Sequence, residues 1–142
     1  MEKTATIGLI GHGAIGMEIL SALGRIGEEE RLAAILVRPG RTAPRAVHDA
    51  AGLIAAQPDI VIECAGHQAV RDHVPALLRA GIDCILSSIG VLADADFAAE
   101  LANAQAQGGG RMLLPAGAIA GLDGFCLLYT SDAADEEDSE DL

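Results

Sequence analysis

The sequence lacks any long apolar run. Apolar residues make up 51% of its 142 residues, but glycine, proline or charged residues divide them into short runs. None of these runs approaches the roughly 20 residues that a membrane-spanning helix needs. Glu2 and Lys3 are followed directly by a strand-like run, which does not resemble the basic and then apolar progression of an export signal. The sequence therefore predicts a cytoplasmic protein with no membrane partner.

Cysteine is scarce as well. The three cysteines, Cys64, Cys84 and Cys126, are an odd number and do not have the spacing of metal ligands. A disulfide framework would need pairs, so the pattern favours a reducing compartment. We expect no metal site and interpret the cysteines as packing residues.

Basic residues are few, with nine Lys and Arg against 21 Asp and Glu, for a net charge of -12. Seven of the acids lie between Asp132 and Asp141, so residues 1–125 hold 14 acids and all nine bases, a net charge of -5. That value is ordinary for an enzyme domain and leaves no basic surface. We therefore expect no nucleic-acid partner.

The composition changes abruptly at Cys126. The segment CLLYTSDAADE that begins there resembles the translation of a sequencing adaptor, and an acidic run follows it to Leu142. We predict that residues 1–125 form one domain and that residues 126–142 are a non-native or disordered acidic tail, with a second domain absent. A natural acidic tail is the alternative interpretation.

Short apolar runs alternate with stretches of helical periodicity along residues 1–125. The predicted strands are residues 5–10, 32–37, 59–63, 83–86 and 112–114. The predicted helices are residues 14–23, 45–56, 68–80 and 94–107, with Pro75 in the third at a kink or in its first turn. Parallel strands need crossover helices, so this alternation predicts an α/β fold with a Rossmann-type, doubly wound parallel sheet covered on both faces.

A glycine-rich segment, GHGAIG at residues 11–16, follows the first predicted strand and opens the first predicted helix. In a G-x-G-x-x-G motif, Gly11 permits the tight turn, Gly13 leaves room for a pyrophosphate, and Gly16 lets the helix approach the strand. A simple glycine turn is the alternative. The predicted cofactor-binding residues of this segment are Gly11, Gly13, Ala14, Ile15 and Gly16.

The expected ligand is a dinucleotide, because no Gly-Lys-Ser or Gly-Lys-Thr follows the glycines as in a P-loop. Where a ribose-binding Asp or Glu is usual, at the end of the second strand, the sequence has Arg38 and, three residues later, Arg41. A guanidinium can pair with a 2'-phosphate, so Arg38 favours NADP over NAD. In the alternative interpretation both arginines belong to a solvated turn, and NAD stays open.

Small and unusual residues follow the later predicted strands, at residues 63–67, 87–93 and 115–123. Ligands of open α/β sheets bind beyond the carboxyl ends of the strands, where small residues let a nicotinamide approach the backbone. For Glu63 and Cys64 taken singly, strand-end packing is the simpler explanation. The predicted cofactor-binding residues here are Cys64, Ala65, Gly66, His67 and Ser87.

These segments and the glycine motif together resemble the N-terminal domain of the L-aspartate dehydrogenase family, over about residues 5–124. The resemblance implies a two-domain, homo-oligomeric enzyme that oxidises L-aspartate with NAD or NADP. The product, iminoaspartate, hydrolyses to oxaloacetate and ammonia or feeds NAD biosynthesis. It also implies that Ala118 lies at the cofactor.

The family's catalytic histidine belongs to the second domain, so the resemblance assigns no catalytic residue to this chain. Of the four histidines present, His67 alone lies at a strand end that faces the proposed nicotinamide site. It could orient cofactor or substrate, or only contact backbone at the start of a helix. Two alternatives stay open, a fragment of another two-domain dehydrogenase of the homoserine dehydrogenase type and a non-catalytic dinucleotide-binding sensor module.

Overall fold

A computed structural model describes residues 2–115, which form one six-stranded parallel sheet. The strands are β1 Ile7–Ile10, β2 Leu32–Leu36, β3 Ala46–Val47, β4 Ile60–Glu63, β5 Asp83–Leu86 and β6 Met112–Leu113. Their order, β3-β2-β1-β4-β5-β6, is that of a doubly wound dinucleotide-binding sheet. This confirms the predicted fold class. The predicted tail and Ala118 lie outside the described residues.

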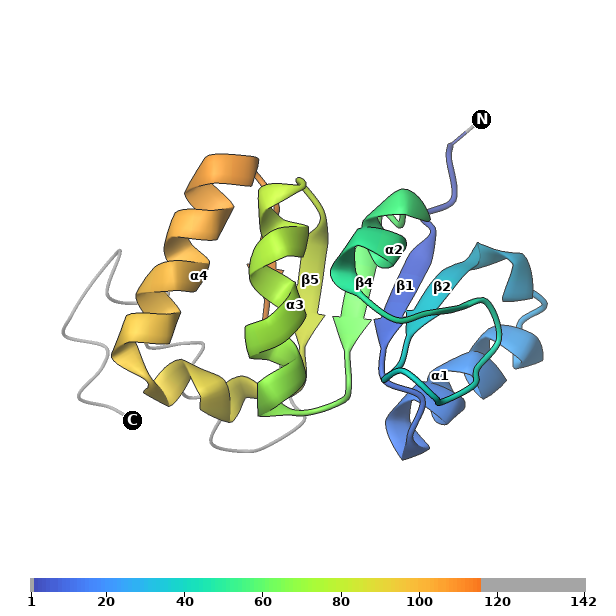
Figure 1. Cartoon of the computed structure of the whole chain (residues 1–142). Coiled ribbons are helices and arrows are strands. Elements are labelled where there is room, and N and C mark those ends of the chain that lie inside the picture. The colour runs from blue at the N-terminus through green and yellow to red at the C-terminus, as the bar shows by residue number, and fades with distance from the viewer. Residues whose placement is uncertain (1, 116–142) are drawn as a thin grey trace, which may run out of the picture.

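Helices cover both faces of the sheet. They are α1 Ala14–Arg25, α2 Ala50–Ala55, α3 His67–Arg79 and α4 Ala95–Gly108, with short 3-10 helices at Glu29–Arg31 and Ile89–Ala93. Figure 1 shows α2, α3 and α4 side by side in front of the strands, while α1 lies on the other side. None of these helices, which belong to residues 2–115, combines the length and apolarity needed to cross a membrane.

The two faces bury separate apolar clusters, as the alternation of side chains along a strand requires. On the larger face, Val70, Val74 and Leu77 of α3 pack against Val61 of β4, and all four are fully buried. These α3 positions have the apolar spacing read from the sequence. The smaller cluster joins Leu23 of α1 to residues of β1 and β2.

The prediction of one helix over residues 45–56 was wrong in its first half. Ala46 and Val47 form the edge strand β3 beside β2, and α2 begins only at Ala50. The cause is Asp49, whose backbone is extended and whose Oδ1 accepts a hydrogen bond from the Gly52 N–H at 2.7 Å. A residue that caps a helix in this way separates it from an extended chain before it.

Pro75 lies in the middle of α3 and is buried, so of the two alternatives the first-turn position is excluded and the kink stays a prediction. The sequence suggested that position because proline has no N–H to donate within a helix. Buried neighbours on the same helix, Val74 and Leu77 among them, retain Pro75 in the interior despite this cost.

The ends of α4 follow the prediction. Asp94 precedes the helix, and its Oδ1 accepts hydrogen bonds from the N–H groups of Asp96 and Phe97 at 3.1 and 3.2 Å. The helix stops where Gly109 adopts a left-handed conformation with φ 83°. A side-chain acceptor at the start and a glycine just past the end are the usual termini of a helix.

Two aspartates join neighbouring strands at the amino edge of the sheet. Asp59 accepts a hydrogen bond from the Thr6 N–H at 2.8 Å, and Asp83 accepts one from the Arg111 N–H at 2.8 Å and another from its guanidinium at 2.7 Å. The bond from Thr6 lowers the pKa of Asp59, and the Arg111 side chain lowers that of Asp83. These carboxylates hold the starts of β1 and β4, and of β5 and β6, together.

The cap at Asp94 makes stability depend on acid pH. The pKa of this carboxyl lies below its ordinary 3.8, because Phe97 N–H and then the Arg71 side chain bind its charged form. The lowered pKa contributes stability in full above pH 3.8 that is lost as pH falls through the folded-state pKa. We expect Asp94→Asn to have a lower Tm than the parent chain at neutral pH and the difference to shrink well below pH 3.8, measured by circular dichroism.

The exposed Glu100, later on α4, supplies the control. Glu100→Gln removes one carboxylate from the same helix without touching its cap, so its Tm difference should stay small at neutral pH. A Tm difference for Asp94→Asn that does not change with pH would contradict this account of the cap.

Candidate functional site

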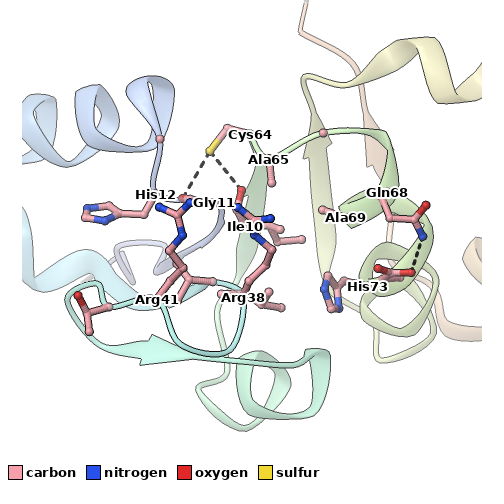
Figure 2. Close-up of a pocket in the computed structure, with 16 residues that line it drawn as sticks. Ile10, Gly11, His12, Arg38, Arg41, Cys64, Ala65, Gln68, Ala69 and His73 are labelled. Atoms are coloured by element: carbon pink, nitrogen blue, oxygen red, sulfur yellow. Dashed lines mark hydrogen bonds between the residues drawn. The ribbon is translucent and has the colours of Figure 1, made fainter.

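A cavity of about 590 Å³ opens at the carboxyl edge of the sheet, next to β1 and β4. At this point the strand order reverses, since the chain runs outward from β1 to β2 on one side and returns to β4 on the other. Its walls are the glycine loop after β1, the turn after β2, the β4 loop and the first half of α3 (Figure 2). Open α/β sheets bind their ligands at such a reversal.

The glycine loop has the geometry that its three glycines predict. Gly11 adopts φ +104°, which side-chain-bearing residues rarely do, and its N–H donates to the Leu36 carbonyl at 2.9 Å. A Cβ on Gly16 would stand 2.6 Å from the Gly11 carbonyl oxygen, whereas a Cβ on Gly13 would have nothing within 4 Å. No side chain caps α1 at Gly13. The first N–H groups of α1 are thus left for a ligand beside an open position.

The turn after β2 brings two arginines to the cavity. The Arg41 N–H donates to the Arg38 carbonyl at 3.0 Å, and Pro39 and Gly40, with φ +88°, fill the two central positions as in a type II turn. Figure 2 shows both guanidinium groups directed toward the glycine loop. Neither arginine has an ion-pair partner among residues 2–115.

The wall opposite the arginines is one face of α3, which the sequence analysis did not assign to the site. Its cavity-lining residues are Gln68, Ala69, Asp72 and His73. Gln68 donates to Asp72 Oδ1 at 2.8 Å, a contact between residues four apart on a helix. Part of the signal was present in the sequence, because Gln68 and Asp72 lie on the helix face opposite the apolar stripe that begins at Val70.

The β4 loop closes the cavity between these walls with Cys64, Ala65 and Gly66. The Cys64 thiol donates to the Ile10 carbonyl at 3.3 Å, which holds the β4 loop against the glycine loop. Burial raises the pKa of this thiol to about 11, and the nearby Glu63 carboxylate adds to the rise. A thiol with that pKa is protonated at neutral pH, so Cys64 serves as a hydrogen-bond donor and not as a nucleophile.

Glu63 ends β4 directly beneath this loop and is fully buried. Its Oε1 accepts hydrogen bonds from the Ala65 and Gly66 N–H groups at 2.8 and 2.9 Å and from the Ser88 hydroxyl at 2.9 Å. Its Oε2 accepts one from the Ser88 N–H at 3.0 Å. Four donors compensate the buried carboxylate, as a buried charge requires. Strand-end packing, the simpler explanation for Glu63 in the sequence, does not describe this role.

The residues predicted to bind cofactor fall into three groups in the structure. Gly11, Gly13, Arg38, Cys64, Ala65 and Gly66 line the cavity. Ala14, Ile15, Gly16, His67 and Ser87 lie near it without lining it, and Ala118 is outside the described residues. Ile15 is 55% exposed, and the Ser87 hydroxyl donates to the Glu63 carbonyl at 2.7 Å.

The cavity offers chemistry for an elongated anion. One end presents two guanidinium groups, the middle presents helix N–H groups beside an open glycine, and the other end is walled by small residues. Phosphates bind well to the first two features. Among residues 2–115, no three His, Cys, Asp or Glu side chains are grouped so that they could hold a metal ion.

The comparison with protein families matches residues 11–115 to the family described as homoserine dehydrogenase, NAD binding domain. The match begins at the first glycine of the glycine loop and covers most of the described chain. It agrees with the site's geometry, because a dinucleotide is an elongated anion with phosphates at its middle.

Among individual proteins, the chain is 38% identical to L-aspartate dehydrogenase 2 of Bordetella bronchiseptica, over 96% of this chain and 52% of that protein. It is 41% identical to L-aspartate dehydrogenase of Ruegeria pomeroyi, over 82% of this chain and 44% of that protein. The crystal structure of aspartate dehydrogenase from Thermotoga maritima superposes with a TM-score of 0.65 and 25% identity, covering 90% of this chain and 51% of that one. The resemblance inferred from the sequence is confirmed, and the chain spans about half the length of the curated relatives it matches.

The raised pKa of Cys64 predicts a slow reaction with alkylating reagents. With a pKa of about 11 in place of 9.0, its thiolate fraction at neutral pH falls about a hundredfold. We expect iodoacetamide to modify Cys64 in the folded chain far more slowly than in the same chain unfolded by urea, measured by peptide-resolved mass spectrometry.

Cys84 provides an internal control, because burial raises its pKa to about 12 and it should react more slowly still. Modification of Cys64 at the rate of the unfolded chain would show that its thiol is neither buried nor bonded to Ile10 as described.

Proposed function

Because the chain belongs to the family of homoserine dehydrogenase-type NAD-binding domains, we propose that it is the cofactor-binding half of an L-aspartate dehydrogenase. The observation that carries the proposal is the cavity at the strand-order reversal, walled by a glycine loop and two arginines, in a chain whose relatives are named L-aspartate dehydrogenases. The proposed domain is residues 1–125, with the acidic residues 126–142 outside it.

The three parts of the cavity suggest how a dinucleotide would bind. Its pyrophosphate would lie on the glycine loop, at the open Gly13 and the N-terminus of α1. Its adenosine half would extend to the turn after β2, and its nicotinamide half would extend the other way, toward the loops after β4 and β5. We propose as cofactor-binding residues those predicted from the sequence, together with Arg41.

The turn after β2 supports NADP as the preferred cofactor. An acid that accepts a hydrogen bond from a free ribose hydroxyl is missing there, and Asp72 of α3 is the sole carboxylate among the lining residues described. Arg38 and Arg41 would instead form charge-assisted hydrogen bonds with a 2'-phosphate. Arg41 places a second guanidinium on the same turn. Two guanidinium groups support binding of a 2'-phosphate more strongly than Arg38 alone.

In the proposed reaction, L-aspartate is oxidised to iminoaspartate, which water converts to oxaloacetate and ammonia. The bound nicotinamide would accept the hydride that leaves Cα of aspartate. The residues of this chain would bind and orient the dinucleotide, and we assign none of them a catalytic role. The enzyme would serve NAD biosynthesis, act in the cytoplasm on a small-molecule substrate, and assemble as a homo-oligomer in its full-length form.

One specific observation favours a second candidate, a homoserine dehydrogenase, because the matching family carries that description. The two are separated by supplying L-aspartate or L-homoserine, with NADP or NAD, to this chain extended by a second domain from its own gene. Reduction of cofactor with aspartate alone supports the first proposal, reduction with homoserine alone supports the second, and dinucleotide binding without either activity supports a sensor module.

Two glycines of the loop provide a matched pair of variants. Gly16→Ala forces its new methyl group against the Gly11 backbone, so we expect a loss of about 1–3 kcal/mol in the free energy of unfolding. Gly13→Ala meets nothing within 4 Å and has φ -88°, which alanine adopts readily, so its Tm should match the parent chain.

The two glycine variants should also differ in how tightly they bind a dinucleotide. The Gly13→Ala methyl group would occupy the space proposed for the pyrophosphate, so we expect its Kd for NADPH to rise about tenfold or more while the fold is intact. Calorimetric titration and thermal unfolding of both variants measure the two effects. Full NADPH affinity in Gly13→Ala would exclude the pyrophosphate from this position.

Cofactor preference is tested at Arg38. We expect the chain to bind NADPH more tightly than NADH, and Arg38→Asp to weaken NADPH binding about 10- to 100-fold while NADH is little affected or gains affinity, because one charged hydrogen bond to phosphate is lost. Arg25→Ala, at an exposed arginine on α1 away from the cavity, is the control. Equal weakening of both cofactors in Arg38→Asp would contradict a role in selecting the 2'-phosphate.

A further inference from the structure

The loops after β4 and β5 share one buried anchor. Glu63 accepts two hydrogen bonds from the β4 loop, at the Ala65 and Gly66 N–H groups, and two from Ser88 of the β5 loop. The Ser87 hydroxyl adds a bond to the Glu63 carbonyl at 2.7 Å. Glu63 is fully buried and does not line the cavity, so its hydrogen bonds act on the cavity through these two loops.

A second contact joins the segments that directly follow these two loops. A Cβ placed on Gly90 would stand 2.8 Å from both Cε1 and Nε2 of His67, so the imidazole rests where only a glycine leaves room. His67 begins α3 directly after the β4 loop, and Gly90 lies in the 3-10 helix directly after the β5 loop. The loops are thus bonded to each other through Glu63, and the exposed His67 side chain lies against the segment that follows the β5 loop.

We propose that Glu63 is a positioning residue that fixes the β4 and β5 loops as one rigid wall for the nicotinamide half of the bound dinucleotide. The inference rests on the proposed function, in which that half extends toward these loops. Rigid loops remove the ordering cost that a mobile wall would add on binding. The adenosine half contacts the turn after β2 and needs neither loop.

The two oxygens of the Glu63 carboxylate accept different numbers of hydrogen bonds, and this difference predicts the effect of a conservative variant. In Glu63→Gln, an amide oxygen in place of Oε1 keeps three of the bonds, but the amide NH₂ then faces the Ser88 N–H, and two donors repel. The variant therefore weakens the link to the β5 loop, which keeps only the Ser88 hydroxyl bond to this side chain, and leaves the β4 loop bonded. It is isosteric with glutamate and removes a buried charge, which favours retention of the fold.

The experiment compares two ligands on the 142-residue chain by isothermal titration calorimetry. NADPH contains both halves of the dinucleotide, while 2',5'-ADP contains only the adenosine side with its phosphates. For Glu63→Gln we expect the Kd for NADPH to rise about tenfold or more and the Kd for 2',5'-ADP to stay within about twofold of the parent chain. General destabilisation would not produce this difference between the ligands.

Two further variants test the same wall without changing Glu63. Ser88→Ala removes one hydroxyl bond to the carboxylate, and Gly90→Ala displaces the far end of the exposed His67 side chain, a shift that costs the fold little. Both variants should raise the Kd for NADPH and not that for 2',5'-ADP, by a smaller factor than Glu63→Gln. Leu101→Val, in the buried core of α4, lowers the Tm away from the loops and should leave both dissociation constants unchanged.

The outcomes separate the two proposals. If the parent chain binds neither NADPH nor NADH, the proposed function fails. If the parent chain binds NADPH but no more tightly than 2',5'-ADP, or if Glu63→Gln binds both ligands as the parent does, the positioning role is overturned and the function stands. If Glu63→Gln weakens the binding of both ligands equally and lowers the Tm, Glu63 has a purely structural role and the positioning role is overturned. If Glu63→Gln does not fold, Ser88→Ala and Gly90→Ala decide between the same results.

Discussion

The closest approach between elements at the cavity is at Gly16, where α1 rests directly on the backbone of Gly11. The space that a Cβ would take there is filled by the Gly11 carbonyl at 2.6 Å and approached by the Cys64 sulfur at 3.5 Å. Three segments, from β1, α1 and β4, therefore meet at one point that has no room for a side chain. The direction of the α1 N-terminus, and with it the position of its free N–H groups, depends on this contact.

Carboxylates stabilise both edges of the sheet, but in different ways. At the amino edge, Asp59 and Asp83 are partly solvated and bind the chain just before a neighbouring strand. At the carboxyl edge, Glu63 is buried and binds the β4 loop, which lines the cavity, and the β5 loop next to it. Exposed ionic contacts of the first kind contribute little to stability individually, whereas a buried carboxylate requires every one of its donors to keep its place. The edge with the buried carboxylate is thus the one at which the cavity opens.

The sequence predicted the fold well where the relevant signal is local. Five of the six strands are short apolar runs bounded by glycine or charge, and Gly11 to Gly16 is a contiguous motif whose geometry follows from residue type. Strand β3 was missed because its two residues lie in an alanine-rich stretch that also suits a helix. The role of Glu63 was missed because its partner Ser88 is 25 residues away in the sequence. The α3 wall was missed because a helical pattern does not show which element lies across a cavity from its polar face. Contacts of this kind are set by strand order, which local patterns do not encode.

The charge of the cavity is a local property that the overall composition conceals. Residues 1–125 carry a net charge of -5, yet a single turn places Arg38 and Arg41 beside the N-terminus of α1, so positive charge and helix N–H groups gather on one wall. Anionic ligands are attracted by such local fields, whatever the net charge of the domain. Because the type II geometry of Pro39 and Gly40 brings both arginines to the same cavity, in the proposed binding mode the choice between dinucleotides would depend on this one turn. The glycine loop, held by Gly16 and Cys64, is a separate segment, so in that binding mode the pyrophosphate and the 2'-phosphate would be bound independently.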